Sequence, residues 1–330
     1  MPGPVDEFDW IGSLRGLTRG DARALRLADD AALLPARPGF DLVISKDAMV
    51  EGVHFPAGEG AEVIARRLLR TSLSDLAAKA ATPFGYFLMT AWPPGRDGAY
   101  RDAFRSGLEQ DGQEFGVALL GGDTVSTPGP LTLSATVLGW VEEGRAVLRS
   151  GACAGDSLVV CGDIGDGWLG LLAVQGTVDD PEGALAERYR LPTPLFALKS
   201  ALIGHARACA DVSDGLIADA GHIAEASGLG VTIELFELPL SPAAHRWSES
   251  QDDRATARLA LATGGDDYAL VCAVDPPDET AFLTAVEALG VPARRAGRFE
   301  VQHGVRVTAH GKEIHVQHFG WRHSDDAAGD

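Results

Sequence analysis

Segments with the spacing of strands and segments with the spacing of helices alternate along the whole chain, and this alternation restricts the fold more than any other feature. In the first half the expected strands are apolar runs at residues 41–45, 86–91, 117–120 and 131–140. The helices expected there carry apolar residues every three or four positions, at 7–17, 61–81 and 100–114. The second half mixes the two in the same way, with strands expected at 157–161, 209–212, 231–235, 268–274, 298–301, 305–308 and 313–316. Each half is therefore predicted to be α/β or α+β.

The length of 330 residues is enough for two domains, each able to bury its own core. A polar, glycine-containing stretch at 149–156 looks like a connector, and the expected boundary lies just before it. We therefore predict an N-terminal domain at 1–145 and a C-terminal domain at 146–330. The small, acidic residues at 324–330 are predicted to form a disordered tail.

The charge balance limits the partners. Lys and Arg number 28 and Asp and Glu 47, so the net charge is −19, which argues against a general nucleic-acid binder. No run reaches the roughly 18 apolar residues of a membrane-spanning helix. The first residues lack the basic and apolar regions of a secretion signal, and the four cysteines form no C-x-x-C pair. We expect a cytoplasmic protein with no membrane or nucleic-acid partner.

Aspartates recur where a predicted strand meets a loop or a helix begins. They are Asp29, Asp30, Asp47, Asp123, Asp211, Asp214, Asp266 and Asp267. Each alone could be an ordinary turn or cap residue. Asp75 is different, because it lies inside the apolar helical pattern of 61–81, where a carboxylate needs a partner. If several of these carboxylates converge, cations must lie between them, and Mg²⁺ is the usual bridge to phosphates. The functional interpretation is a nucleotide site with several Mg²⁺ ions.

A glycine turn in the second half also suggests phosphate. Gly165, Gly167 and Gly170 match G-x-G-x-x-G between a strand and a helix. The acidic residues that follow, Asp179 and Asp180, lead into a predicted helix rather than a second strand, which disfavours a dinucleotide fold. Backbone N–H groups at the helix start could still receive a phosphate. No G-x-x-x-x-G-K-[ST] occurs, so a P-loop is excluded.

Seven motifs occur in a specific order from about Phe8 to Trp321. They are DDAAL at 29–33, SKDAMVEGVHF at 45–55, LSDLAA at 73–78, GGDT at 121–124, RSG at 149–151, DVSDGL at 211–216 and GGDDY at 264–268. In this combination the chain resembles the thiamine-monophosphate kinase family, within the aminoimidazole-ribonucleotide-synthetase-like superfamily. The resemblance implies an N-terminal α/β domain that forms a homodimer through its sheet, and a C-terminal α+β domain.

The resemblance also implies the ligands. ATP is the co-substrate and thiamine monophosphate the substrate, with several Mg²⁺ ions between them. The matching metal-ligand positions are Asp30, Ser45, Lys46, Asp47, Asp75, Asp123, Asp211 and Asp214. Nucleotide contacts match Gly122, Asp123, Arg149 and Ser213, and substrate contacts match His54, Asp266 and Trp321. No general base is expected. Asp75, Asp123 and Asp214 are expected to be the most critical residues.

The implied reaction is phosphorylation of thiamine monophosphate to thiamine diphosphate by ATP. The alternatives are another ATP-dependent synthetase of the superfamily, distinguished by its product, and a non-catalytic nucleotide- or metal-binding module, distinguished by binding without turnover.

Three residues depart from the family pattern. Ala28 stands where the family often has Gly, and Asp266 where it has Glu. Lys46 stands where Thr is usual, so its ammonium either takes the place of one metal or points away while its carbonyl ligates.

Overall fold

The computed structural model describes residues 7–321, so the predicted tail at 324–330 lies outside the described residues. The chain divides into two compact units. Met1–Leu76 and Ala81–Arg145 form the first, and Ala77–Ala80 and Ala146–Asp330 form the second. In the part of the chain from 7 to 321, no helix is both long and apolar enough to cross a membrane.

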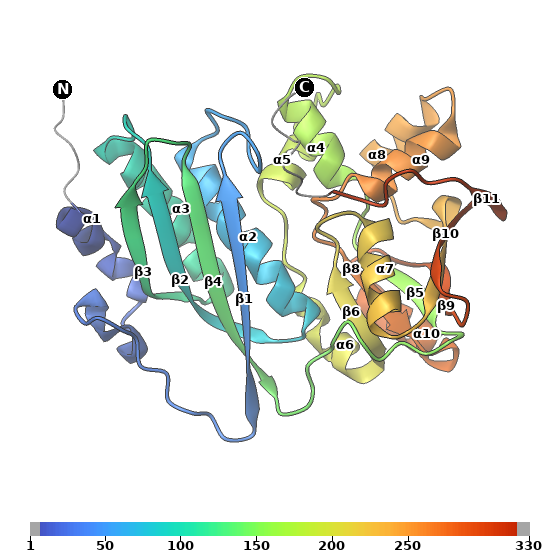
Figure 1. Ribbon diagram of the computed structural model, residues 1–330, viewed down its shortest axis with the longest axis horizontal. Helices are drawn as coiled ribbons and strands as arrows, with labels where there is room; N and C mark the ends of the chain where they lie inside the picture. Colours follow the sequence, from blue (N-terminus) through green and yellow to red (C-terminus); the bar gives the residue numbers. More distant parts are fainter. Residues whose placement is uncertain (1–6, 322–330) are drawn as a thin grey trace. The chain divides into compact units, whose positions relative to one another are not determined.

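The first unit is built on a four-stranded sheet (Figure 1). Its order is β1 (Phe40–Val50), β4 (Thr132–Glu142), β2 (Thr82–Trp92) and β3 (Ala118–Ser126). β4 runs antiparallel to both of its neighbours, whereas β2 and β3 are parallel. A parallel pair needs a crossover connection, and α3 (Gly98–Phe115) supplies it. Asp97 caps the start of α3 with its carboxylate, which accepts the Tyr100 N–H, and Gly116 caps the end in the left-handed conformation.

Two helices cover one face of this sheet (Figure 1). α2 (Ala61–Ala78) buries Ile64, Leu68 and Leu73 almost completely, and α3 packs beside it. The helices approach so closely that a Cβ at Gly107 would lie 2.3 Å from the Glu62 carbonyl oxygen. The N-terminal segment packs against the sheet too, since Ala24 and its neighbours contact Leu120 and Leu138. This segment contains α1 (Glu7–Leu14), η1 (Arg15–Thr18) and η2 (Ala22–Leu27).

The second unit is built on a seven-stranded sheet. Its strands, in spatial order, are β11 (Lys312–Ile314), β10 (Gly304–Ala309), β7 (Gly230–Glu234), β9 (Ala293–Glu300), β5 (Ser157–Cys161), β8 (Leu270–Val274) and β6 (Ala206–Asp211). Only the β10–β7 pair is parallel among the described strands of this sheet. The central strands are apolar on both faces, as expected for a sheet covered on both sides.

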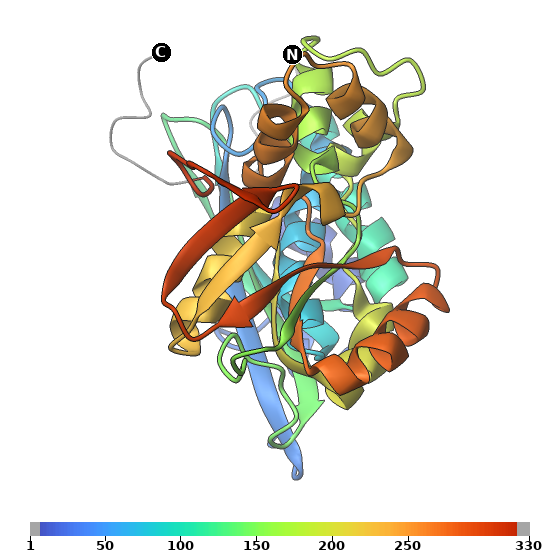
Figure 2. The ribbon, with the colours of Figure 1, turned by 90° about the vertical axis from the view of Figure 1, so that its right-hand side faces the viewer.

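Alternate residues of the central strands enter two separate cores. Val160 and Val271 pack with the residues of α7 (Leu216–Ala226) on one side. Val159 and Cys272 pack on the other side with α6 (Lys199–His205) and α10 (Glu279–Glu287). Figure 2 shows α7 and α10 on opposite faces of the sheet. The other helices of the unit are α4 (Asp166–Val174), α5 (Ala184–Arg190), η3 (Phe196–Leu198), η4 (Leu235–Glu237), α8 (Pro242–Glu249), α9 (Arg254–Thr263) and η5 (Pro276–Asp278).

The α/β character of both halves is confirmed, but several boundaries differ from expectation. The first strand continues from 45 to Val50, so that Asp47 lies within β1. The GGDT motif lies within β3 rather than in a loop after residue 120. The α8 and α9 helices were not predicted.

Candidate functional site

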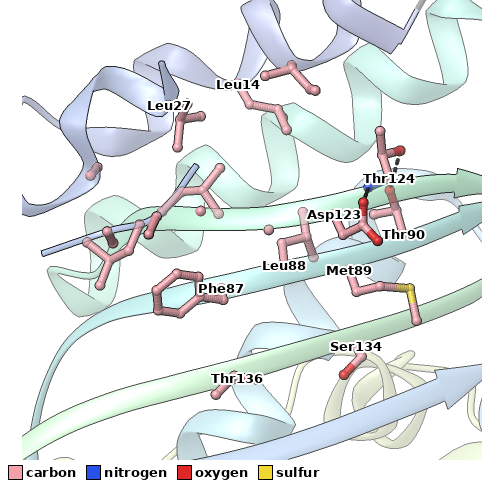
Figure 3. A pocket seen from close by; sticks show the side chains of 18 of the residues that line it. Leu14, Leu27, Phe87, Leu88, Met89, Thr90, Asp123, Thr124, Ser134 and Thr136 are labelled. Carbon is pink, nitrogen blue, oxygen red and sulfur yellow. Dashed lines mark hydrogen bonds between the residues drawn. The ribbon is translucent and has the colours of Figure 1, made fainter. Parts of the chain in front are cut away.

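A pocket of about 460 Å³ opens on the first unit, between its sheet and the N-terminal segment. Strands β2, β3 and β4 form one wall, with Phe87, Met89, Asp123 and Ser134 at its surface (Figure 3). Leu14 of α1 and Leu27 of η2 face this wall from the other side. The N-terminal segment thus contributes apolar side chains and also the carboxylates of Glu7, Asp29 and Asp30, and the sheet contributes Asp123 and Ser134.

The backbone of β3 reaches Asp123 through two glycines. A Cβ at Gly122 would lie 1.9 Å from the Leu88 carbonyl oxygen on β2, so another residue here would force the two strands apart. The Asp123 Oδ1 atom accepts the Thr124 N–H at 2.9 Å, and the hydroxyls of Thr124 and Thr90 are hydrogen-bonded at 2.9 Å (Figure 3). The glycines thus allow the two strands to pack closely. The Asp123 carboxylate that follows them is exposed and lines the pocket.

Lys46 reaches the same pocket from β1. Its Nζ donates to the Ser134 hydroxyl at 2.8 Å, and that hydroxyl donates to the Asp47 carbonyl oxygen at 2.7 Å. Asp30 also lines the pocket. The Lys46 side chain therefore lines the pocket, and ligation of a metal by the Lys46 carbonyl stays a prediction.

A second group of oxygen ligands lies between β1 and α2. Because side chains alternate along a strand, Ser45 and Asp47 point to the opposite face from Lys46. The Ser45 hydroxyl donates to Asp75 Oδ2 at 2.5 Å, which gives the mid-helix carboxylate the partner it needs. Burial, and secondly the charge of Asp75, raise the pKa of Asp47 to about 6, although a hydrogen bond with Ser72 lowers it. Two carboxylates and a hydroxyl in this crowded place are the hard oxygen donors that Mg²⁺ prefers.

The predicted metal ligands of the first unit thus form two groups rather than one. Asp30 and Asp123 line the pocket, whereas Asp47 and Asp75 interact on the helix-covered side of β1. Within residues 7–321, no three His, Cys, Asp or Glu side chains are close enough together to hold a metal ion. The full ligand set therefore stays a prediction.

His54 lies in the loop after β1, and hydrogen bonds of His54 and Glu51 hold this loop in place. Its Nδ1 accepts the Val50 N–H at 3.0 Å, so a neutral His54 carries its proton on Nε2. The neighbouring Glu51 accepts a hydrogen bond from Arg96 at 2.6 Å. The contact with Val50 thus fixes the orientation of the His54 ring at the end of β1.

In the second unit, the loop between β6 and α7 is shaped by a residue that the sequence analysis missed. The buried Asp219 accepts the N–H groups of Ser213 and Asp214 at 3.1 Å each. Asp219 also lies 3.4 Å from His222, and the hydrogen bond between them raises the pKa of His222, which the charge of Arg149 lowers. Asp219 lies in the first turn of the helix, where acidic residues are favoured, and this position was the available signal.

Other segments of the second unit pack onto this loop. The Asp266 N–H donates to the Ser213 carbonyl, and the Trp321 N–H donates to the Asp214 carbonyl, both at 2.8 Å. A Cβ at Gly265 would lie 2.5 Å from the Ser213 carbonyl oxygen, so the glycine is needed for this approach. Four predicted residues, Ser213, Asp214, Asp266 and Trp321, are therefore brought together, and Asp211 lies at the end of the adjoining strand β6.

The glycine turn before α4 is explained by packing rather than by phosphate. Both Gly165 and Gly167 donate their N–H groups to the buried Asp267 carboxylate at 2.9 Å. A Cβ at Gly167 would lie 2.1 Å from the Asp266 carbonyl, and one at Gly170 would lie 2.1 Å from the Leu185 carbonyl. Since Asp267 already occupies this helix start, the expected phosphate position there is not supported.

Comparisons with known proteins agree with this architecture. Residues 28–141 match the N-terminal domain of AIR synthase related proteins, and residues 154–310 match the C-terminal domain. The chain is 55% identical to the thiamine-monophosphate kinase of Caulobacter vibrioides, over 97% of this chain and 91% of the relative. It is 35% identical to that of Escherichia coli K12, over 91% of each. The chain belongs to the thiamine-monophosphate kinase family.

Solved structures of this kinase family have the same fold. The thiamine-monophosphate kinase of Stenotrophomonas maltophilia is 36% identical, with a TM-score of 0.81 over 92% of this chain and 96% of that one. A structure of AaThiL complexed with AMPPCP and TMP is 26% identical, with a TM-score of 0.74 over 95% and 96% of the two chains. Escherichia coli HypE, at 22% identity and a TM-score of 0.73, shares the fold alone.

One departure from the kinase family pattern is resolved by the backbone. Ala28 has φ −121° and is unstrained; the left-handed residues precede it, at Leu25, Arg26 and Leu27. Asp266 has φ 66°, a conformation that Asp tolerates better than most residues, and its contact with the substrate stays a prediction.

Proposed function

We propose that this protein transfers a phosphoryl group from ATP to thiamine monophosphate, giving ADP and thiamine diphosphate. The observation that carries the proposal is the 55% identity to a thiamine-monophosphate kinase along 97% of the chain. The complex of AaThiL with AMPPCP and TMP supports both ligands, since AMPPCP is an ATP analogue.

The chemistry requires positioning more than proton transfer. The acceptor is a phosphate monoester with a second pKa of about 6, so its attacking oxygen is already anionic at neutral pH. No general base is needed, which fits a site rich in carboxylates. The remaining problem is the repulsion between two anionic phosphates that must meet in line.

We further propose that Mg²⁺ is bound by the predicted ligands. Asp30, Asp47, Asp75 and Asp123 would hold it in the first unit, with Ser45 and the backbone of Lys46, and Asp211 and Asp214 in the second. Bound Mg²⁺ would neutralise phosphate charge and orient the reacting groups. The crowded Asp47–Asp75 pair supports this proposal, because a divalent cation relieves carboxylate repulsion.

The remaining predicted residues would bind the organic ligands. Gly122, Arg149 and Ser213 are proposed for the nucleotide, where the Arg149 guanidinium would donate to phosphate oxygens. His54 and Asp266 are proposed for thiamine monophosphate. Trp321, which is about half exposed, would stack on the cationic thiazolium ring.

We also propose a homodimer formed through the sheet of the first unit, and a cytoplasmic location, where ATP is available. The exposed apolar side chains of Leu42 and Ile44 on β1 support the dimer. Sedimentation of the purified protein tests it directly.

Mass spectrometry after incubation with MgATP and thiamine monophosphate tests the activity. We expect thiamine diphosphate and ADP in equal amounts. A ring-closed or different phosphorylated product would instead favour another synthetase of the superfamily, and nucleotide binding without turnover would favour a binding module.

A further inference from the structure

The charge distribution around the pocket of the first unit leaves one residue unexplained. Among the described residues that line the pocket, four carry carboxylates, Glu7, Asp29, Asp30 and Asp123, and only Lys46 carries a positive charge. A pocket of this kind repels an anionic ligand unless its cations are placed where the anion binds. The position of Lys46 is therefore important for any phosphate that enters.

The lysine side chain is held in a fixed direction. Ser134 is almost fully buried and uses its hydroxyl proton on the Asp47 carbonyl, so its lone pairs remain to accept from Lys46 Nζ. An ammonium has three donors, and Ser134 takes one. In the part of the chain from 7 to 321, no carboxylate lies within the 4 Å of an ion pair with Lys46.

We propose that the Lys46 ammonium is a phosphate ligand of the nucleotide, with its remaining donors directed to polyphosphate oxygens in this pocket. The inference rests on the proposed function, because it assumes that ATP binds here. It also gives Lys46 a role that its side chain performs without a metal: a fixed charge that attracts the polyphosphate directly. Ser134 is then a positioning residue, which acts through Lys46.

The test is the affinity for AMPPCP, measured by calorimetry in EDTA and again in Mg²⁺. In EDTA we expect Lys46→Met to raise the Kd at least tenfold, because it removes a charge-assisted hydrogen bond. Lys46→Arg should retain part of the affinity, and Ser134→Ala should show a smaller loss than Lys46→Met. Adenosine, which has no phosphate, should bind equally to the wild type and Lys46→Met.

The matched control is Lys312→Met. Lys312 is an exposed lysine on β11 of the second unit, so its substitution makes the same change of net charge outside the pocket. Its affinity for AMPPCP should equal that of the wild type. Circular dichroism and thermal unfolding establish whether each variant is folded. If Lys46→Met does not fold, the comparison is made between the wild type and Lys46→Arg.

Two results would overturn the inference while leaving the proposed function intact. One is an equal Kd of the wild type and Lys46→Met in EDTA. The other is a wild type that binds AMPPCP only when Mg²⁺ is present, since the metal alone would then hold the phosphates. A wild type that binds no AMPPCP under either condition, and forms no thiamine diphosphate, would instead refute the proposed function.

Discussion

Substitution of Asp267 is the sharpest test of how the second unit is held together. Its carboxylate accepts the N–H groups of Gly165 and Gly167, and both donors are buried. Asp267→Ala leaves the two N–H groups without an acceptor, and each such group costs about 1–3 kcal/mol. The expected loss is therefore about 2–6 kcal/mol, a large part of the roughly 5–15 kcal/mol of a typical domain.

The pH dependence gives a second, independent measure. Burial is the main reason that the pKa of Asp267 is raised to about 8; the hydrogen bonds from Gly165 and Gly167 lower this pKa, and the charges of Asp166 and Asp266 raise it. In the unfolded chain this carboxyl titrates near 3.8. Between the two values the folded protein holds a proton that the unfolded chain has released. The free energy of unfolding therefore falls by about 1.4 kcal/mol per pH unit as the pH rises through this range.

Asparagine does not titrate, so Asp267→Asn lacks this pH dependence. The free energy of unfolding of the wild type should therefore decrease relative to that of Asp267→Asn between pH 5 and pH 8. Urea denaturation followed by tryptophan fluorescence measures it, since Trp168 and Trp247 pack together with centroids 5.5 Å apart beside this loop. Titration of other groups cancels in the difference. A difference that stays constant over this range, or an Asp267→Ala variant within about 0.5 kcal/mol of wild type, would refute the reasoning.

Three further outcomes are expected. Asp75→Asn should abolish formation of thiamine diphosphate while leaving the unfolding temperature nearly unchanged. The control Asp252→Asn, at an exposed position, should remain active. Near-normal turnover of Asp75→Asn would exclude this residue from the metal site. EDTA should stop turnover and Mg²⁺ should restore it, so persistent activity in EDTA would contradict the metal-assisted mechanism. Gly167→Ala, whose Cβ would meet the Asp266 carbonyl at 2.1 Å, should destabilise the protein by about 1–3 kcal/mol and raise the KM for thiamine monophosphate, whereas Gly204→Ala, which meets nothing within 4 Å, should not.

The sequence predicted the fold class and most elements because their hydrophobic spacing is local. Two helices were missed although they carry readable signals: Ser241 followed by Pro242 at the start of α8, and Asp253 at the start of α9. The GGDT motif was expected at the end of a strand because glycines are common in turns. In the structure its glycines instead allow β3 to pack closely against β2.

The geometry of the site was harder to predict. Asp267 caps a helix that begins about a hundred residues earlier in the chain, and no local pattern connects the two. Ser134 likewise reaches Lys46 across 88 positions. Such contacts depend on strand register and loop path, which the sequence of one segment does not specify. The expected strand ended at residue 45, whereas β1 continues to Val50. Only with Lys46 and Asp47 both within the strand does it follow that their side chains point to opposite faces of the sheet.

Residues Ala77–Ala80 belong to the second unit, although the residues before and after them belong to the first. Ala78 and Ala80 are buried in a core of the second unit, and Lys79 donates to the Cys209 carbonyl at 2.7 Å. A fragment beginning at residue 146 would therefore lack part of its own interior, and the fragment ending at 145 would expose those alanines to water. Dissection at the apparent boundary should yield two aggregation-prone pieces, and co-expression of both should be needed to recover either.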